Sequence, residues 1–191
     1  MRIVAGRYRG RRLQVPAGYD VRPSSERSRE ALFNILESGR LTEGQHAVRG
    51  ARVLDAFAGS GALGIEALSR GASEVFFLEQ APAALRCLRQ NLQGLESSAS
   101  LHILKEDALN PPPAERPVDI LLMDPPYGQG LTARALPALT EKGWLDGDTL
   151  AVVESARKEL QALPADFQLL DRRTYGRAEL SFLMLTKART A

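Results

Sequence analysis

The sequence predicts an α/β protein built on a mostly parallel, seven-stranded sheet with an antiparallel hairpin at one edge. Between residues 51 and 155, short apolar runs alternate with segments of helical apolar spacing, which is typical of a parallel sheet with helices on both faces. Residues 167–187 hold two further apolar runs about Tyr175 and Gly176 with no helix between them, which favours an antiparallel hairpin. A chain of 191 residues suits one continuous core.

The first forty residues are expected to form a hairpin and a helix. Residues 2–16 alternate apolar and basic side chains around glycines, which predicts a short β-hairpin with a basic outer face. Residues 23–38 open with Pro and Ser at a capping position and continue with apolar residues at helical spacing. We therefore divide the chain into a basic extension, residues 1–20, and a main domain, residues 21–191.

The remaining elements follow in strict alternation. Glycine closes the first helix of this series at Gly71, and proline opens the second at Pro82. A proline-rich loop is expected at 111–117. The predicted strands cover 51–57, 74–79, 101–104, 118–124 and 149–155, and the predicted helices cover 62–71, 82–92 and 131–142.

Composition excludes several classes of protein. No apolar run approaches the roughly 20 residues of a membrane span, and the first residues lack the apolar block of a signal peptide, so we expect a cytoplasmic protein with no membrane partner. Cys87 is the single cysteine, which excludes an intramolecular disulfide. With only His46 and His102 beside it, no spaced cluster for zinc exists, and we expect no metal.

Positive charge is concentrated at the beginning of the chain. Residues 1–30 carry eight arginines against three acids, although the net charge of the whole chain is only +2. Such asymmetry indicates a polyanionic partner, and the guanidinium fork suits phosphates. A solvated charged surface is the alternative explanation. The eight arginines are Arg2, Arg7, Arg9, Arg11, Arg12, Arg22, Arg27 and Arg29.

A glycine-rich loop follows the first predicted strand of the parallel unit. In DAFAGSGALG, the glycines at 59, 61 and 64 have the G-x-G-x-x-G spacing between a strand and a helix. Glycine lets the backbone turn sharply and lets a ligand approach its amides. Glu79 ends the next strand, where a carboxylate can accept hydrogen bonds from both ribose hydroxyls. This pattern predicts an adenosine-type nucleotide, and both NAD and S-adenosylmethionine fit it.

Acids at three successive strand ends favour a cationic cofactor. Asp55 at the end of the first strand would oppose a pyrophosphate but suits the sulfonium and ammonium groups of S-adenosylmethionine. Asp107, just after the third strand, can accept a hydrogen bond from an adenine amine. Surface acids near loops are the alternative. The predicted cofactor-binding residues are Asp55, Phe57, Gly59, Gly61, Glu79, Asp107 and Ala108.

The stretch ILLMDPPYG, residues 120–128, carries a resemblance to a known family. An apolar strand ends there in an acid, two prolines and an aromatic ring. D-P-P-Y together with D-x-F-x-G-x-G resembles the amino-methyltransferases. Taken whole, the sequence resembles the RsmD-type guanine-N2 methyltransferases of 16S ribosomal RNA, through residues 2–13, 22–36, 55–72, 124–128 and 175–180.

This resemblance implies a Rossmann-like class I methyltransferase that transfers a methyl group from S-adenosylmethionine to a guanine N2 amine. Such an amine is a poor nucleophile because its lone pair is delocalised into the ring. In the family, the acidic side chain and the first proline's carbonyl accept its two hydrogens, which corresponds to Asp124 and Pro125. Prolines bring no competing amide hydrogen, and Pro126 further fixes the backbone. Tyr127 offers a flat face to a base swung out of its stack.

The same resemblance implies small-subunit ribosomal RNA as partner, within an assembled or assembling 30S particle, and a monomeric enzyme. We assign phosphate contacts to the N-terminal hairpin, where Tyr8 either stacks on a base or packs against the hairpin. Arg22 lies in a segment that resembles the one that the family places near the mouth of the active site. The residues predicted to contact RNA are Arg7, Arg9, Arg11, Arg12, Arg22 and Tyr127.

Four alternatives remain open at this point. A DNA adenine-N6 methyltransferase would normally carry a further target-reading domain, for which no residues remain. A glutamine methyltransferase normally has Asn at the position of Asp124. An NAD-dependent oxidoreductase has no use for Asp-Pro-Pro-Tyr, and a catalytically silent RNA-binding module would bind RNA without turnover.

Overall fold

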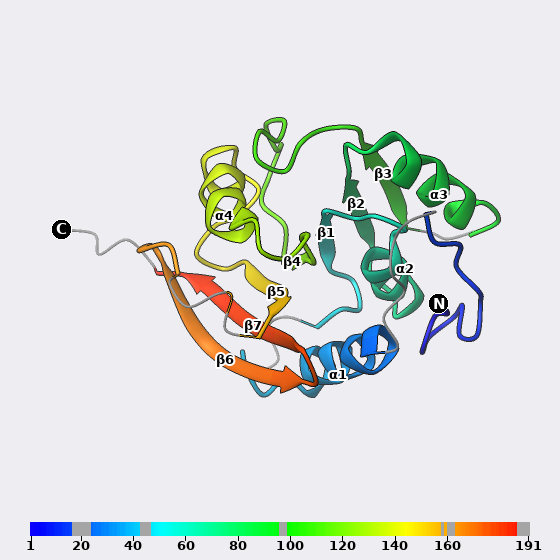
Figure 1. Cartoon of the computed structure of the whole chain (residues 1–191), viewed down its shortest axis with the longest axis horizontal. Helices are drawn as coiled ribbons and strands as arrows, with labels where there is room; N and C mark the ends of the chain where they lie inside the picture. Colours follow the sequence, from blue (N-terminus) through cyan, green and yellow to red (C-terminus); the bar gives the residue numbers. More distant parts are fainter. Residues whose placement is uncertain (17–23, 43–46, 96–98, 158, 160–162, 187–191) are drawn as a thin grey trace.

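The computed structural model describes residues 1–16, 24–42, 47–95, 99–157, 159 and 163–186. Figure 1 shows a single twisted sheet with helices on both faces. The helices are α1 (Ser24–Ser38), α2 (Ala62–Ser69), α3 (Pro82–Leu92) and α4 (Leu131–Glu141). The strands are β1 (Arg52–Ala56), β2 (Glu74–Leu78), β3 (Ser100–Leu104), β4 (Ile120–Met123), β5 (Leu150–Ala156), β6 (Phe167–Tyr175) and β7 (Ala178–Leu185).

The order of the strands confirms the predicted sheet. It runs β3-β2-β1-β4-β5-β7-β6, with the first five strands parallel and β7 antiparallel to both of its neighbours. The last strand of the chain therefore lies inside the sheet, and β6 forms the edge. A register shift between Leu169 and Asp171 interrupts the pairing of β6 with β7. No helix in the described part of the chain is long and apolar enough to cross a bilayer.

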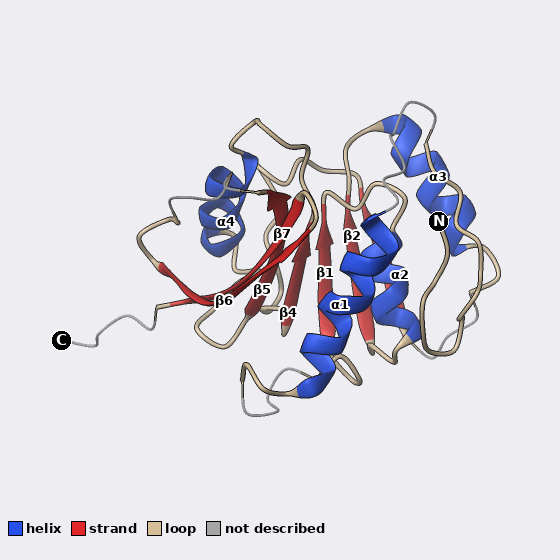
Figure 2. Cartoon of the chain, turned by 60° about the horizontal axis from the view of Figure 1, so that its bottom comes forward, coloured by secondary structure: helices blue, strands red, loops and turns tan. Residues whose placement is uncertain are grey.

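Alternating residues of each strand build two separate cores, one on each face of the sheet. On one face, Val53 of β1 and Leu122 of β4 pack with residues of α1, α2 and α3. On the other, Leu54 and Met123 pack with the buried side of α4 and with Trp144. Figure 2 shows α1 and α2 in front of the strands. Because residues two positions apart along a strand point to the same face, the face of any residue that follows a strand can be determined from these core residues.

The N-terminal segment pairs with itself less regularly than the predicted hairpin. A single antiparallel bridge joins Arg2 and Arg12, and residues 1–16 contain no regular strand. The physical reason is competition for the amides, because those of Val4 and Ala5 donate to the Glu66 carboxylate of α2 at 2.8 and 2.9 Å. The segment is therefore docked on α2. The predicted boundary between residues 20 and 21 lies outside the described residues.

Candidate active site

A pocket of about 730 Å³ opens at the carboxyl ends of the parallel strands. It lies where the strand order reverses, between β1, which leads to β2 and β3, and β4, which leads to β5. In open α/β sheets this switch point is the usual ligand site, and the volume falls within the range of small-molecule sites. Of the residues predicted for cofactor and catalysis, the pocket is lined by Asp55, Phe57, Gly59, Glu79, Asp107, Ala108, Asp124, Pro125, Pro126 and Tyr127.

The loop after β1 presents its backbone to this pocket. Gly59 has φ of +56°, and a side chain added there would meet only the Phe57 carbonyl oxygen, at 3.9 Å. Phe57 itself has φ of +61°, a conformation that side chains rarely adopt and that is concentrated at functional loops. The open space beside Gly59 is what a ligand needs to approach the amides of the loop.

The other two glycines of the motif serve packing rather than ligand approach. A β-carbon on Gly61 would lie 2.4 Å from Leu88 of α3, and one on Gly64 would lie 2.4 Å from the Phe77 ring of β2. Gly61 does not line the pocket, although the sequence pattern predicts it as a cofactor residue. Its part is to let α2 begin close against α3.

Asp55 is buried at the bottom of the pocket. Its side chain is 1% exposed, and it accepts a hydrogen bond from the Gly64 amide at 2.8 Å. Burial raises the pKa of the Asp55 carboxyl well above its ordinary value, and the charges of Asp124 and Glu79 add to this, while the Gly64 amide lowers it. A cation bound above Asp55 would favour its ionised form.

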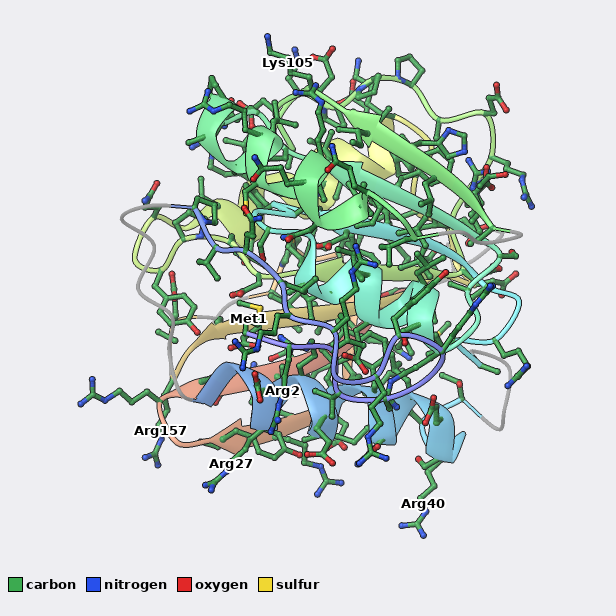
Figure 3. The ribbon with its side chains drawn as sticks, turned by 90° about the vertical axis from the view of Figure 1, so that its right-hand side faces the viewer. Met1, Arg2, Arg27, Arg40, Lys105 and Arg157 are labelled. Atoms are coloured by element: carbon green, nitrogen blue, oxygen red, sulfur yellow. The ribbon has the colours of Figure 1, made fainter. Side chains whose placement is uncertain are left out.

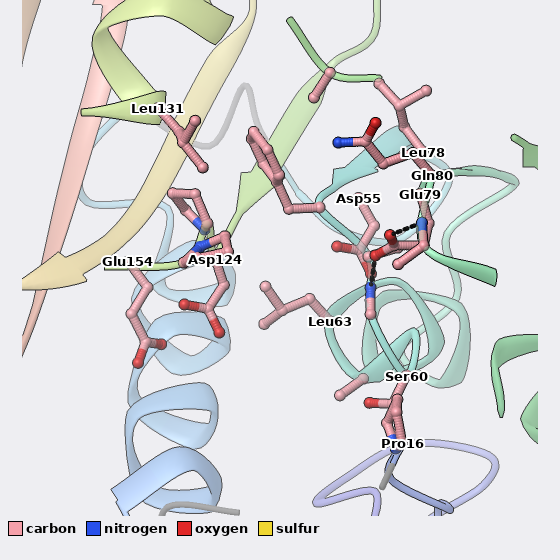
Figure 4. A pocket seen from close by; sticks show the side chains of 18 of the residues that line it. Pro16, Asp55, Ser60, Leu63, Leu78, Glu79, Gln80, Asp124, Leu131 and Glu154 are labelled. Atoms are coloured by element: carbon pink, nitrogen blue, oxygen red, sulfur yellow. Dashed lines mark hydrogen bonds between the residues drawn. The ribbon is translucent and has the colours of Figure 1, made fainter. Parts of the chain in front are cut away.

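Two further carboxylates are fixed by backbone amides. Glu79 accepts from the amides of Gly59 at 2.8 Å and Ala81 at 2.7 Å, as the dashed lines in Figure 4 show. Asp107 accepts from the amide of Leu109 at 3.0 Å. Because Glu79 braces the loops after β1 and β2, and Asp107 braces the loop after β3, both side chains are held in place without a ligand.

The Asp-Pro-Pro-Tyr corner follows β4 and projects into the same pocket. Asp124 is exposed, whereas Pro125 is buried and holds the corner against the protein. The Tyr127 hydroxyl donates to Glu154 of β5 at 3.5 Å. Beyond the corner, the amide of Gly128 donates to Glu159. The corner is thus tied to the end of β5 at two points.

Strand alternation directs the acids of the site to one face of the sheet. Asp55 lies two residues after Val53, and Asp124 lies two residues after Leu122, so both point to the face that α1 and α2 cover. Glu79 and Glu154 follow Phe77 and Val152 of the same core in the same way. Figure 4 shows these four side chains around the pocket. With Glu106 and Asp107, six acidic residues line the pocket, which has the electrostatics of a site for a cationic ligand.

Of the arginines predicted to contact RNA, those that the structure describes lie outside the pocket. The amide of Arg7 donates to the carbonyl of Ser69 at 2.7 Å, which places the tip of the segment at the end of α2 remote from the pocket. Arg7, Arg9 and Arg12 are exposed. Arg11 is instead engaged in the fold, because its guanidinium donates to the carbonyls of Asn91, Gln93 and Gly94 at the end of α3. Arg22 lies outside the described residues.

Tyr8, for which stacking and packing both remained open, is half-buried. Its ring packs against the core beneath the segment, with the Arg7 guanidinium 5.5 Å from the ring centre. Other arginines reach solvent nearer the pocket, and Figure 3 shows Arg27 of α1 and Arg157 projecting outward. Arg157 follows β5 only three residues after Glu154.

Sequence reasoning missed three charged residues that line the pocket, Arg29, Glu106 and Glu154. Arg29 is 3% exposed and lies on α1, where its charge interacts with Glu66, Glu26 and Glu154. Burial lowers the pKa of the Arg29 guanidinium, and these carboxylates raise it. Arg29 lies in segment 22–36, which carries the family resemblance, but no role in the pocket was predicted for it, and Glu154 belongs to no recognised motif. The available signal was that Glu154 interrupts the apolar strand β5.

The fold and the strand-end pocket define a Rossmann-like methyltransferase. The sequence matches the family described as conserved hypothetical protein 95 over residues 1–184. Ribosomal RNA small subunit methyltransferase D of Haemophilus influenzae is 36% identical over 92% of this chain and 89% of its own length. The Escherichia coli protein of the same name is 36% identical over 88% of this chain and 82% of its own length. The chain therefore belongs to this family, that of the small-subunit ribosomal RNA methyltransferase D proteins.

Solved structures agree with the assignment. Escherichia coli yhhF, described as a candidate methyltransferase, superposes with a TM-score of 0.79 at 32% identity and covers 98% of both chains. At 14% identity, the magnesium protoporphyrin IX methyltransferase of Synechocystis still superposes with a TM-score of 0.65, over 87% of this chain and 82% of that one. That structure holds bound S-adenosylmethionine, and at this identity the likeness concerns the fold alone.

Proposed function

We propose that this protein transfers a methyl group from S-adenosylmethionine to the exocyclic N2 amine of one guanine in small-subunit ribosomal RNA. The observation that carries the proposal is that one pocket is lined both by the glycine loop with its acids and by the Asp-Pro-Pro-Tyr corner. The names of the relatives support ribosomal RNA as the substrate. A ribosomal substrate implies a cytoplasmic protein, and we propose that it acts as a monomer without a metal.

The residues present suit the proposed cofactor. The pocket offers buried Asp55 for positive charge, the open side of Gly59 for close approach to backbone, and Glu79 and Asp107 at the next two strand ends. Phe57 and Ala108 line the pocket beside them. S-adenosylmethionine, when bound, supplies a methyl group on a sulfonium that is already a good leaving group.

The Asp-Pro-Pro-Tyr corner would make the weakly nucleophilic N2 amine reactive. In this proposal the Asp124 carboxylate and the Pro125 carbonyl accept the two N2 hydrogens, draw the amine toward tetrahedral geometry and aim its lone pair at the methyl group. Asp124 also opposes the positive charge that develops on nitrogen, and it accepts the proton afterwards, directly or through water. Pro126 keeps the corner rigid, and Tyr127 provides the face on which the base stacks.

A direct assay tests the whole proposal. Small ribosomal subunits from cells lacking this protein are incubated with labelled S-adenosylmethionine and the purified protein, and the RNA is digested to nucleosides. We expect label in N2-methylguanosine at one site. Label in N6-methyladenosine, or none in either subunits or free RNA, would overturn the proposal and bring the DNA adenine alternative forward.

Cofactor affinity is expected to rise with pH because of Asp55. The folded protein without ligand holds the pKa of this carboxyl above its ordinary value, and a bound cation favours the ionised form, so binding releases a proton below that pKa. The affinity should then increase up to about tenfold per pH unit and level off above the pKa. Calorimetry in two buffers of different ionisation enthalpy measures the released proton.

The same shift has the opposite effect on the stability of the ligand-free protein. Because the Asp55 pKa is raised by folding, the unfolded chain loses this proton at lower pH, and stability falls as pH rises from about 3.9 through the folded pKa. In Asp55→Asn both dependences on pH should disappear. Affinity that does not change with pH in the wild type would remove Asp55 from the cation site.

Exposed arginines of the N-terminal segment are expected to make the RNA affinity dependent on salt. Deleting the segment is a poor test, because Ile3 and Leu13 belong to the core. A variant that combines Arg7→Gln, Arg9→Gln and Arg12→Gln keeps the fold and removes only charge. Each lost phosphate contact should reduce the slope of log K against log salt by about 0.7 to 0.9.

Binding of 16S ribosomal RNA over a series of salt concentrations measures this slope. Arg134→Gln is the control, because Arg134 is exposed on α4, on the opposite face of the sheet. An unchanged slope in the triple variant would move the RNA-binding surface elsewhere, and the exposed Arg27 and Arg157 would be tested next.

A further inference from the structure

We propose that Glu154 reads the N1–H group of the target base and thereby selects guanine over other bases that carry an exocyclic amine. The inference rests on the proposed function, because it concerns the base that Asp124 and Pro125 hold. Glu154 lies in β5 and lines the pocket together with Asp124 and Tyr127. No sequence motif marks it.

The sheet places Glu154 next to the catalytic corner. Met123, the last residue of β4, pairs with Val153 of β5 in parallel register, so Asp124 directly after β4 and Glu154 within β5 follow matching positions. Neighbouring strands of a sheet lie roughly 4.8 Å apart, and side chains at matching positions point to the same face. Figure 4 shows both carboxylates projecting the same way into the pocket.

The surroundings of Glu154 hold its carboxylate in position. Its Oε1 accepts from the Tyr127 hydroxyl at 3.5 Å, and its Oε2 accepts from the Ser28 hydroxyl of α1 at 3.3 Å. The positive charge of Arg29 lies close enough to interact with it. A carboxylate has about four lone-pair positions, so the two hydroxyl donors alone do not saturate it.

Guanine is the base whose edge matches two adjacent carboxylates. Its N1–H and its N2 amine are neighbouring donors, whereas adenine and cytosine place an unprotonated ring nitrogen, an acceptor, beside their amines. An ionised carboxylate can only accept. With Asp124 on the amine, Glu154 would pair with N1–H of guanine and would face the ring nitrogen of adenine or cytosine without a hydrogen. A site built for a donor strongly rejects an analogue that lacks it.

A change of base and a change of residue together test the assignment. The guanosine mapped by the methylation assay is replaced with 2-aminopurine riboside, which keeps the N2 amine but has an acceptor at N1. Small subunits reconstituted with either RNA are the substrates. We expect wild-type kcat/KM to be at least tenfold higher for guanine, because a hydrogen bond to a charged group is lost with the analogue.

The variant Glu154→Gln should narrow or reverse this preference. The amide keeps the shape of the side chain, but its NH₂ group can donate to N1 of 2-aminopurine. Methylation of guanine is expected to fall at least tenfold while methylation of the analogue rises relative to the wild type.

Glu115→Gln is the matched control, because Glu115 is exposed in the loop before β4, at the opposite edge of the sheet. Equal loss on both bases in Glu154→Gln would show that Glu154 acts only through the packing of Tyr127 and α1. Equal activity of the wild type on both bases would overturn the assignment without any variant. If the proposed function itself fails, the wild type labels no guanine at all.

Discussion

Asp124→Ala is expected to lower kcat for methyl transfer by about 10³-fold while cofactor affinity stays within a few-fold of the wild type. The magnitude follows from the loss of a positioned group that acts on developing charge, and in known cases one such group is worth about 10² to 10³ in kcat. Asp124 is exposed at the mouth of the pocket, whereas the carboxylates beside the glycine loop are largely buried. Single-turnover methylation and calorimetry with S-adenosylmethionine measure the two quantities separately.

Two companion variants sharpen this test. Asp124→Asn keeps one acceptor oxygen but removes the charge, so its activity should fall between that of the alanine variant and that of the wild type. Asp148→Ala removes an exposed acid at the opposite edge of the sheet, before β5, and should leave both quantities unaltered. Equal loss of turnover and of cofactor affinity in Asp124→Ala would place Asp124 in the cofactor site instead of the catalytic corner.

Glu66→Ala is expected to reduce the free energy of unfolding by about 3–5 kcal/mol. Glu66 is fully buried, and it accepts from the amides of Val4 and Ala5 and from the Arg70 guanidinium at 2.9 Å. Arg29 lies 3.5 Å away on α1. Removing the carboxylate leaves two amides without their acceptor and two buried cations without their common counter-charge. Urea unfolding followed by circular dichroism measures the loss.

The loss of stability in Glu66→Ala should begin at the N-terminal segment. Because Glu66 docks residues 4 and 5 onto α2, limited proteolysis of Glu66→Ala should cut the N-terminal segment before the sheet. Glu37→Ala is the control. Glu37 pairs with the same Arg70 at 2.9 Å but is half exposed, so its loss should amount to less than about 1 kcal/mol. Similar losses in the two variants would show that burial of Glu66 contributes little.

Local patterns were sufficient for most of the fold. Strands β1 to β5 and helices α2 to α4 lie within two or three residues of the predicted ranges, because alternation, glycine and proline act within a few residues of chain. The insertion of β7 between β5 and β6 was not predictable from local pattern, since it depends on which edge pairs with β5. The irregular N-terminal segment depends on Glu66, about sixty residues away.

The candidate site divides in the same way. Asp55, Glu79, Asp107 and Asp124 were predictable because each ends or follows a strand, and the carboxyl ends of parallel strands meet at one edge. Glu154 was not, since its proximity to Asp124 depends on the register of β4 with β5. The sequence pattern also could not distinguish the glycine that faces the pocket from the two that are needed for packing. The neighbours that exclude a side chain at Gly61 and Gly64 come from other elements of the fold.

The hydrogen bonds of the carboxylates around the pocket make the candidate site preorganised. Asp55 accepts an amide of α2, Glu79 accepts amides of the loops after β1 and β2, and Asp107 accepts an amide of the loop after β3. The ligand-free protein therefore already holds these loops in place. Ordering a flexible loop on binding costs conformational entropy, and a loop that is ordered beforehand avoids this loss. If the proposed cofactor binds here, it does so without reordering these loops. The heat capacity change on binding should reflect the ligand surface buried and not the folding of a loop.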